Sequence, residues 1–168
     1  MKTPADPPAT PAASRAGFGL SLKGRALRYL AAREHSRAEL ERKLAPHEET
    51  PGQLAQVLDD LQAKDFISET RVMESVVHRR EARYGALRIR QELQSKGLGA
   101  ETVALALAQL KDTELARAQA VWQRKFGSPA INAAGQMRQI RFLLSRGFSA
   151  EAAGRVVRNP RLDDSLDA

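Results

Sequence analysis

YGALRIRQELQSKGL, residues 84–98, contains the start, the inner face and the end of one helix. Ile89 and Leu93 lie four residues apart, a spacing that places them on a single helix face. Gly97 follows where a helix end takes a left-handed residue, and Leu98 can then fold back onto Leu93, as in a Schellman motif. The stretch therefore predicts a short amphipathic helix that ends at Gly97.

The same pattern returns on either side of this stretch. A shift of 49 residues places Leu40 on Ile89, and a shift of 50 places residues 96–98 (KGL) on residues 146–148 (RGF). Internal repeats indicate tandem structural units, and units this small are expected to bury each other's faces. We therefore predict an all-α chain, an elongated curved rod of three tandem three-helix repeats: residues 22–68, 69–110 and 112–158.

Several helix starts carry capping signals. Ser36 and Glu39 form a capping box, in which a hydroxyl and a carboxylate satisfy free N–H groups at a helix N-terminus. Thr50 is expected to cap the next helix, with Pro51 at its first position and Gln53 completing a second capping box.

The inner faces of the helices follow from the spacing of apolar residues. They are expected to include Ala31 in the first unit and Met137 in the third. Trp122 shares helical spacing with Leu115 and Ala118, which favours burial in the core over stacking on a nucleic-acid base.

The composition argues against several protein classes. The 168 residues include no cysteine, so disulfides and thiolate metal sites are excluded. No apolar run reaches the roughly 18 residues of a transmembrane helix. Residues 1–16 are rich in Pro and Ala without a signal-peptide pattern, and residues 159–168 are slightly acidic. We expect two disordered tails around a cytoplasmic monomer.

The sequence shows no catalytic or metal-binding motif. His35, His47 and His78 are scattered and do not form an H-E-x-x-H pair. A G-x-x-x-x-G-K-[ST] nucleotide loop is also missing. We therefore expect no enzyme activity, no metal and no cofactor, and a structural role for His35 beside the Ser36 cap.

Positive charge increases along the chain, whose net charge is +7. Residues 23–69 hold eight basic and nine acidic residues, residues 70–110 hold seven and four, and residues 111–158 hold nine and three. A basic surface of this kind implies an acidic partner, usually nucleic acid.

Three stretches resemble the RecX family in their order and spacing. Residues 30–44 (LAAREHSRAELERKL) are similar to the family's opening pattern, L-A-x-R-x-H-S-x-x-E-L-x-x-K-L. Residues 84–97 and residues 140–148 (IRFLLSRGF) resemble its second and third motifs. One departure is that residues 68–69 are Ser-Glu where the family usually has an Asp pair.

This resemblance implies a function that the periodicity does not. RecX proteins are tandem three-helix repeats that bind RecA on single-stranded DNA. They lower its ATP hydrolysis and strand exchange, favour net filament loss, and so modulate DNA repair and recombination. They act stoichiometrically and without a cofactor. The expected partners are the RecA filament and single-stranded DNA, the latter either directly or through RecA.

Basic residues of the second and third units, with one tyrosine, are the candidate partner-binding residues. They are Tyr84, Arg88, Arg90, Lys96, Arg124, Lys125, Arg138, Arg141 and Arg146.

The spacing of these arginines predicts how they are arranged. Arg138 and Arg141 are three residues apart and are expected to share a helix face. Arg88 and Arg90 are two apart, so one of them is expected to pair with Glu92 or another acid. Three other interpretations remain open: a solvated basic face, a helix-turn-helix-like DNA-binding protein acting through phosphate contacts, and an inert helical scaffold.

Overall fold

The computed structural model describes residues 19–160, which form nine α-helices, one short 3-10 helix and no strand. The first unit contains α1 (Leu22–Ala32), α2 (Arg37–Leu44), η1 (Ala45–His47) and α3 (Gln53–Ala63). The second contains α4 (Glu69–Arg80), α5 (Ala86–Ser95) and α6 (Ala100–Lys111). The third contains α7 (Glu114–Lys125), α8 (Ala133–Ser145) and α9 (Ala150–Arg158). The predicted all-α fold of three three-helix units is confirmed.

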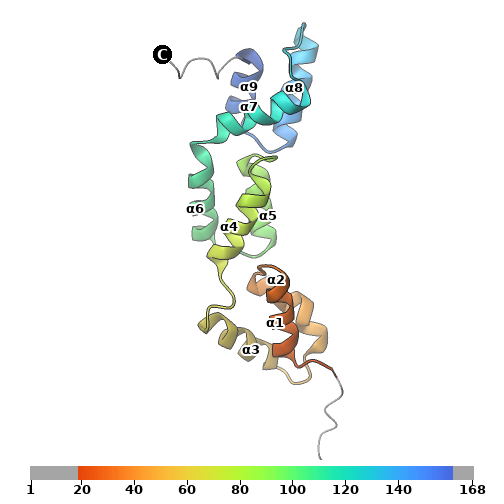
Figure 1. The fold of residues 1–168 in the computed structure, drawn as a ribbon, viewed down its shortest axis with the longest axis vertical. Helices are drawn as coiled ribbons and strands as arrows, with labels where there is room; N and C mark the ends of the chain where they lie inside the picture. The colour runs from red at the N-terminus through yellow and green to blue at the C-terminus, as the bar shows by residue number, and fades with distance from the viewer. Residues whose placement is uncertain (1–18, 161–168) are drawn as a thin grey trace, which may run out of the picture.

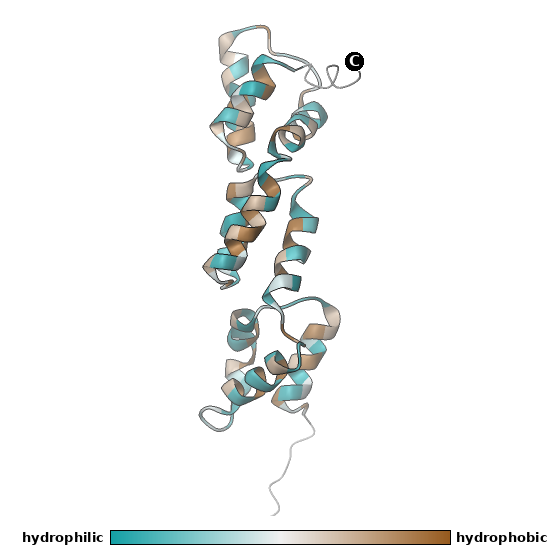
Figure 2. Cartoon of the chain, turned by 90° about the vertical axis from the view of Figure 1, so that its left-hand side faces the viewer, coloured by the Kyte–Doolittle hydropathy of each residue, from teal (hydrophilic) through white to brown (hydrophobic). Residues whose placement is uncertain are grey.

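The three units lie in a row and form an elongated rod (Figure 1). Each unit has its own cluster of buried apolar side chains, around Leu40 and Leu58 in the first, Ile89 and Leu93 in the second, and Trp122 in the third. Figure 2 shows apolar and polar positions alternating along the helices, as amphipathic helices around small cores require. The expectation that neighbouring units bury each other's apolar faces is therefore wrong, because helix ends and loops form the junctions.

Trp122 is 1% exposed, which confirms its predicted place in the core. Its indole Nε1 donates to Gln139 Oε1 at 3.0 Å, and Gln139 Nε2 donates to the Ser128 carbonyl at 3.1 Å. A buried indole N–H needs such an acceptor. Gln139 accordingly takes an inner position on α8, and Met137, predicted to face inward, is 47% exposed.

The capping signals give a mixed result. Ser36 and Glu39 form the predicted capping box. The second box is wrong, because α3 begins after Gly52, which has a φ of +87° and provides no side chain to cap the helix. Glu48, which precedes Gly52 in the sequence, caps the helix instead, because its Oε1 accepts from the Leu54 N–H at 3.0 Å. Ala31, predicted to face inward, is exposed on α1.

Both predicted glycine turns are confirmed. Gly97 and Gly147 have φ values of +75° and +88°. The Leu98 N–H donates to the Leu93 carbonyl at 3.3 Å, and the Phe148 N–H donates to the Leu143 carbonyl at 3.2 Å. These are the closing bonds of two Schellman motifs.

The predicted disordered tails lie outside the described residues, apart from residues 159 and 160. Between residues 19 and 160, each helix is too short or too polar to cross a bilayer.

Candidate interface for an acidic partner

The first and second units meet where the end of α5 contacts the start of α2. Ser36 Oγ donates to the Lys96 carbonyl, and Lys96 Nζ lies 2.8 Å from Glu39 Oε1. Gly97 is so close to α2 that a Cβ added to it would lie 2.7 Å from the Ala38 Cβ. The Lys96 side chain is only 13% exposed. Its predicted role in partner binding does not fit these surroundings, because its charge is already paired inside the junction.

Glu39 is the electrostatic centre of this first junction. Burial by itself raises the pKa of Glu39, but hydrogen bonds from Lys96, the Ser36 N–H and Arg33 together lower it, to about 2. The neighbouring His35 is 3% exposed, and burial is the main cause that lowers its pKa. Its Nδ1 is 3.0 Å from the Arg33 carbonyl. The predicted structural role of His35 agrees with this burial.

The second and third units meet at the equivalent positions of the repeat. The Gly85 N–H donates to the Arg146 carbonyl at 2.9 Å, and the Leu87 N–H donates to the Gly147 carbonyl at 3.1 Å. A Cβ on Gly85 would lie 2.3 Å from the Gly147 carbonyl carbon. The free N–H groups at the start of α5 thus bind the free carbonyls at the end of α8. As a result α8, α5 and α2 follow one another end to end along the rod (Figure 1).

Arg146 lies on aromatic rings at this second junction. Its guanidinium carbon is 5.5 Å from the centroid of the Tyr84 ring and 5.1 Å from that of Phe142. These distances suit cation–π attraction, which positions the charge without neutralising it.

A second arginine at this junction, Arg117, was not predicted from the sequence. It donates to the Tyr84 carbonyl at 2.9 Å and to the Leu110 carbonyl, also at 2.9 Å. Burial lowers the pKa of Arg117.

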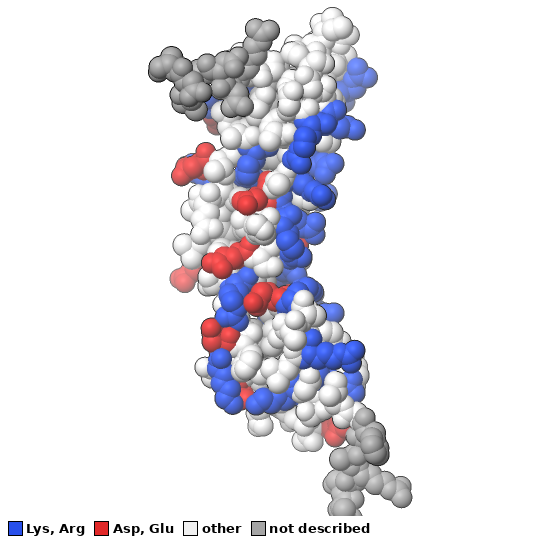
Figure 3. Space-filling view, viewed as in Figure 1, with Lys and Arg blue, Asp and Glu red and all other residues white. Residues whose placement is uncertain are grey.

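A basic hollow of about 330 Å³ lies beside Arg146. Arg83, Arg124 and Lys125 line it together with Arg146. Arg124 is held in place because its guanidinium donates to the Ala82 carbonyl. Figure 3 shows the Lys and Arg side chains gathered along the right-hand side of the second and third units, with most acidic residues in that part of the view lying farther left. Arg83 was not among the predicted residues, and only its place in the fold identifies it.

The outer part of α8 carries the other predicted pair. Arg138 and Arg141 are exposed and line one shallow hollow, as their spacing predicts. Met137 lines the same hollow, and the fully exposed Ile131 lies close by, in an adjoining hollow that also includes Arg138. This part of the third unit therefore combines two cations with exposed apolar side chains.

The predicted pairing of Arg88 or Arg90 with Glu92 is wrong. Glu92 pairs instead with Arg80, at 2.7 Å. Arg88 lies beside Tyr84 at the second junction, whereas Arg90 is exposed on α5 and does not line the basic hollow.

Ion pairs become sparse in the third unit, where Arg155 alone among the cations of residues 111–158 pairs with a carboxylate, whereas the second unit pairs Arg71, Arg80 and Lys96. In the first unit, Lys23, Arg33, Arg37 and Lys64 all pair with carboxylates. Within residues 19–160, Lys96 is the one predicted site residue in an ion pair. The remaining predicted cations are therefore not neutralised by any acidic side chain in the described part of the chain.

Comparison with known proteins gives one consistent result. Models of the first, second and third three-helix domains of RecX match residues 23–61, 68–107 and 112–157. A regulatory protein RecX from Leptothrix cholodnii is 59% identical over 139 residues, covering 83% of this chain and 88% of that protein. The regulatory protein RecX of Ralstonia nicotianae is 49% identical, covering 86% and 92%.

Solved structures share the fold at lower identity. A crystal structure of RecX from Lactobacillus salivarius superposes with a TM-score of 0.71 at 20% identity, covering 82% of this chain and 92% of that chain. A second crystal structure, of a regulatory protein RecX, gives a TM-score of 0.66 at 21% identity, covering 78% and 68%.

Proposed function

The chain belongs to the RecX family of regulatory proteins, and from this premise we propose that it binds the RecA filament assembled on single-stranded DNA. Binding inhibits RecA ATPase and strand exchange and favours filament disassembly. The protein thereby modulates recombination and DNA repair. It acts by occupying the filament, without a cofactor.

The observation that carries this proposal is the set of cations that the fold leaves without acidic partners on the second and third units. Charges that the fold does not use remain available to an acidic surface. Each exposed pair contributes little, about 0 to 1 kcal/mol, so several must act together. A rod of three units can contact more than one subunit of a filament, and such multivalency raises the overall affinity.

The outer part of α8 supports a protein partner. Met137 is 47% exposed beside Arg138 and Arg141, and Ile131 is fully exposed nearby. Methionine and arginine are enriched in protein interfaces, and exposed apolar side chains supply area that becomes buried on binding. This surface is our proposed RecA contact.

The basic hollow favours a second candidate function, direct DNA binding through phosphate contacts. Four cations line that hollow, and phosphate binding by such groups is sequence-independent and strongly dependent on salt. A plain DNA-binding protein would inhibit RecA only by masking its DNA.

The test is RecA ATPase on single-stranded DNA, titrated with this protein. We expect inhibition at substoichiometric to equimolar ratios. Arg138→Glu with Arg141→Glu should raise the concentration needed by more than tenfold while helicity and melting stay unchanged, since exposed charges rarely hold a fold together.

A matched control is Arg25→Glu with Arg28→Glu, which has the same spacing and charge change on α1 of the first unit. It should inhibit nearly as well as the wild type. Greater damage in this control than in the α8 variant, with both folded, would place the contact at the other end of the rod. Inhibition that vanishes in excess DNA would favour the DNA-masking function.

A further inference from the structure

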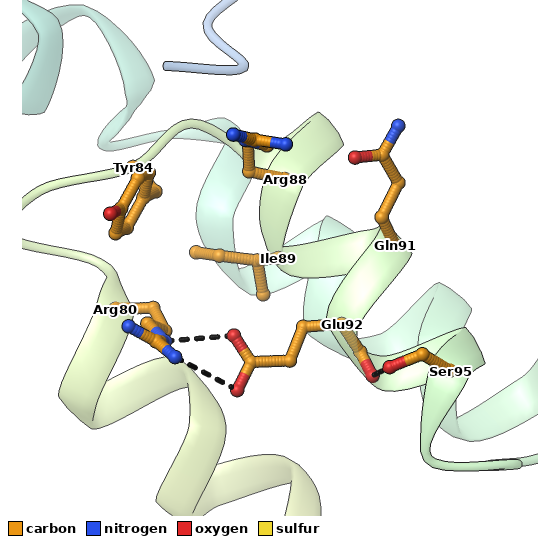
Figure 4. Close-up of a pocket in the computed structure, with 7 residues that line it drawn as sticks. All are labelled: Arg80, Tyr84, Arg88, Ile89, Gln91, Glu92 and Ser95. Carbon is orange, nitrogen blue, oxygen red and sulfur yellow. Dashed lines mark hydrogen bonds and ion pairs between the residues drawn. The ribbon is translucent and has the colours of Figure 1, made fainter.

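A hollow of about 360 Å³ lies on the second unit, next to the second junction. Figure 4 shows Tyr84 on one side, Ile89 between the walls, Arg88 and Gln91 along α5, and the Arg80–Glu92 pair at the opposite end. This volume lies within the range of roughly 300 to 1,000 Å³ that small-ligand pockets occupy.

The side chains around this hollow have the chemistry that recognises a planar base. Tyr84 offers an aromatic ring, Arg88 a planar guanidinium, and Gln91 an amide that both donates and accepts hydrogen bonds. Unstacked bases of single strands bind to such aromatic and guanidinium planes, and Gln can bond their edges. Arg80 is neutralised by Glu92 at 2.7 Å, so it shapes the hollow without adding net charge.

Arg146 connects this hollow to the basic hollow. Its guanidinium carbon lies 5.5 Å from the centroid of the Tyr84 ring, and it also lines the basic hollow with Arg83, Arg124 and Lys125. A phosphate-binding surface therefore lies next to a pocket suited to a base, which is the combination that single-strand-binding proteins use.

We infer that the hollow beside Tyr84 takes one base of a single DNA strand, while adjoining phosphates of that strand lie in the basic hollow beyond Arg146. This inference rests on the proposed function and assigns it a direct nucleic-acid contact. Duplex DNA does not satisfy the site, since a base stacked inside a duplex cannot enter a pocket. An acidic peptide would use the cations but not the aromatic wall and the amide.

The test compares two fluorescent oligonucleotides of equal length, one oligo-dT and one abasic, which carries the same phosphates without bases. Anisotropy titration at fixed salt should show that the wild type binds oligo-dT about five- to tenfold more tightly, within the range known for base–aromatic stacking. Tyr84→Ala should remove this preference and Tyr84→Phe should keep it. Phe66→Ala is the matched control, because Phe66 is an exposed aromatic residue, 48% exposed, outside the hollow.

Because Tyr84 also packs against the second core, melting curves must accompany Tyr84→Ala, and Arg88→Gln on the exposed side of the hollow provides a second variant. Arg88→Gln should reduce the preference at least twofold. Equal wild-type affinity for the two oligonucleotides would overturn the inference. So would an unchanged preference for oligo-dT in a folded Tyr84→Ala variant. So would a poly-glutamate peptide that displaces oligo-dT from the wild type but not from Tyr84→Ala. RecA inhibition by these proteins is scored separately: a wild type that prefers oligo-dT but leaves RecA ATPase unaffected contradicts the proposed function alone.

Discussion

The two junctions of the rod join equivalent positions of the repeat by different chemistry. At the first junction, Lys96 at the end of α5 forms a shielded ion pair with Glu39 at the start of α2. At the second, Arg146 at the end of α8 lies near Arg88 at the start of α5, and backbone hydrogen bonds hold the two helices together. The shift that aligns Leu40 with Ile89 also aligns Glu39 with Arg88.

One exchange of charge therefore separates a structural joint from the surface that we propose binds the partner. At the first junction, where the repeat has Glu39, the cation opposite it, Lys96, is neutralised and nearly enclosed. Where the repeat has Arg88, two like charges share the junction, and among the described residues neither has a carboxylate partner. Both cations therefore remain available to an incoming anion. The fold thus uses the same contact once for stability and, in the function that we propose, once for recognition.

The largest expected effect comes from Gly85→Ala, which tests whether the second junction depends on close backbone approach. The added Cβ would lie 2.3 Å from Gly147 backbone atoms, so α5 and α8 must separate. We expect a loss of about 1 to 3 kcal/mol in the free energy of unfolding, the usual range for overpacking, measured by urea denaturation.

Gly99→Ala is the control for this variant, because Gly99 also precedes a helix and a Cβ there would lie 3.4 Å from Glu69 Oε2, an ordinary contact. It should change stability by much less. Equal stability of the two variants would show that the close approach at Gly85 contributes nothing.

The next effect concerns the first junction and pH. The pKa of Glu39 falls from 4.5 to about 2 on folding, so its contribution to stability is complete above about pH 5 and is lost as the pH falls toward 2. Given partial solvent screening, this contribution is of order 1 to 3 kcal/mol. Glu39→Gln should therefore be less stable than the wild type at pH 7, and the difference should shrink between pH 5 and pH 2.

The measurement is urea denaturation at a series of pH values. His35 is present in both proteins, so its own titration, with a pKa lowered by burial, cancels in the comparison. A stability difference that stays constant down to pH 2 would contradict the assigned role of Glu39.

The smallest effect on stability has the opposite sign. Arg88→Glu recreates at the second junction the acid of the first, facing Arg146 and placed in the first turn of α5, where a negative charge is favourable. We expect a gain of about 0.3 to 1 kcal/mol in the free energy of unfolding. Binding of oligo-dT should weaken at the same time. If stability and binding both fall, the exchange of charge does not explain the difference between the junctions.

Much of this architecture can be predicted from local sequence, and the reasons are physical. Gly97 and Gly147 mark helix ends because the left-handed conformation there is costly for other residues. The helix faces follow from apolar spacing, although Met137 misleads, since the indole of Trp122 requires Gln139 on the inner side of α8.

The surface was harder to predict because it depends on contacts between units. Lys96 and Arg146 occupy matching positions in the sequence, and only the three-dimensional neighbour of each shows that one is neutralised and the other is not. Arg83 and Arg117 carry no motif, and their roles arise from the loop between α4 and α5 meeting the third unit. Local periodicity contains no information on such pairings.

The end-to-end contact of α8, α5 and α2 also has a mechanical consequence. The apolar clusters do not cross from one unit to the next, so helix ends and loops join the units without a shared apolar core. A rod built in this way bends first at its junctions. The rod should therefore flex at its two junctions. An anion bound to the unpaired arginines of the second junction should make that junction stiffer.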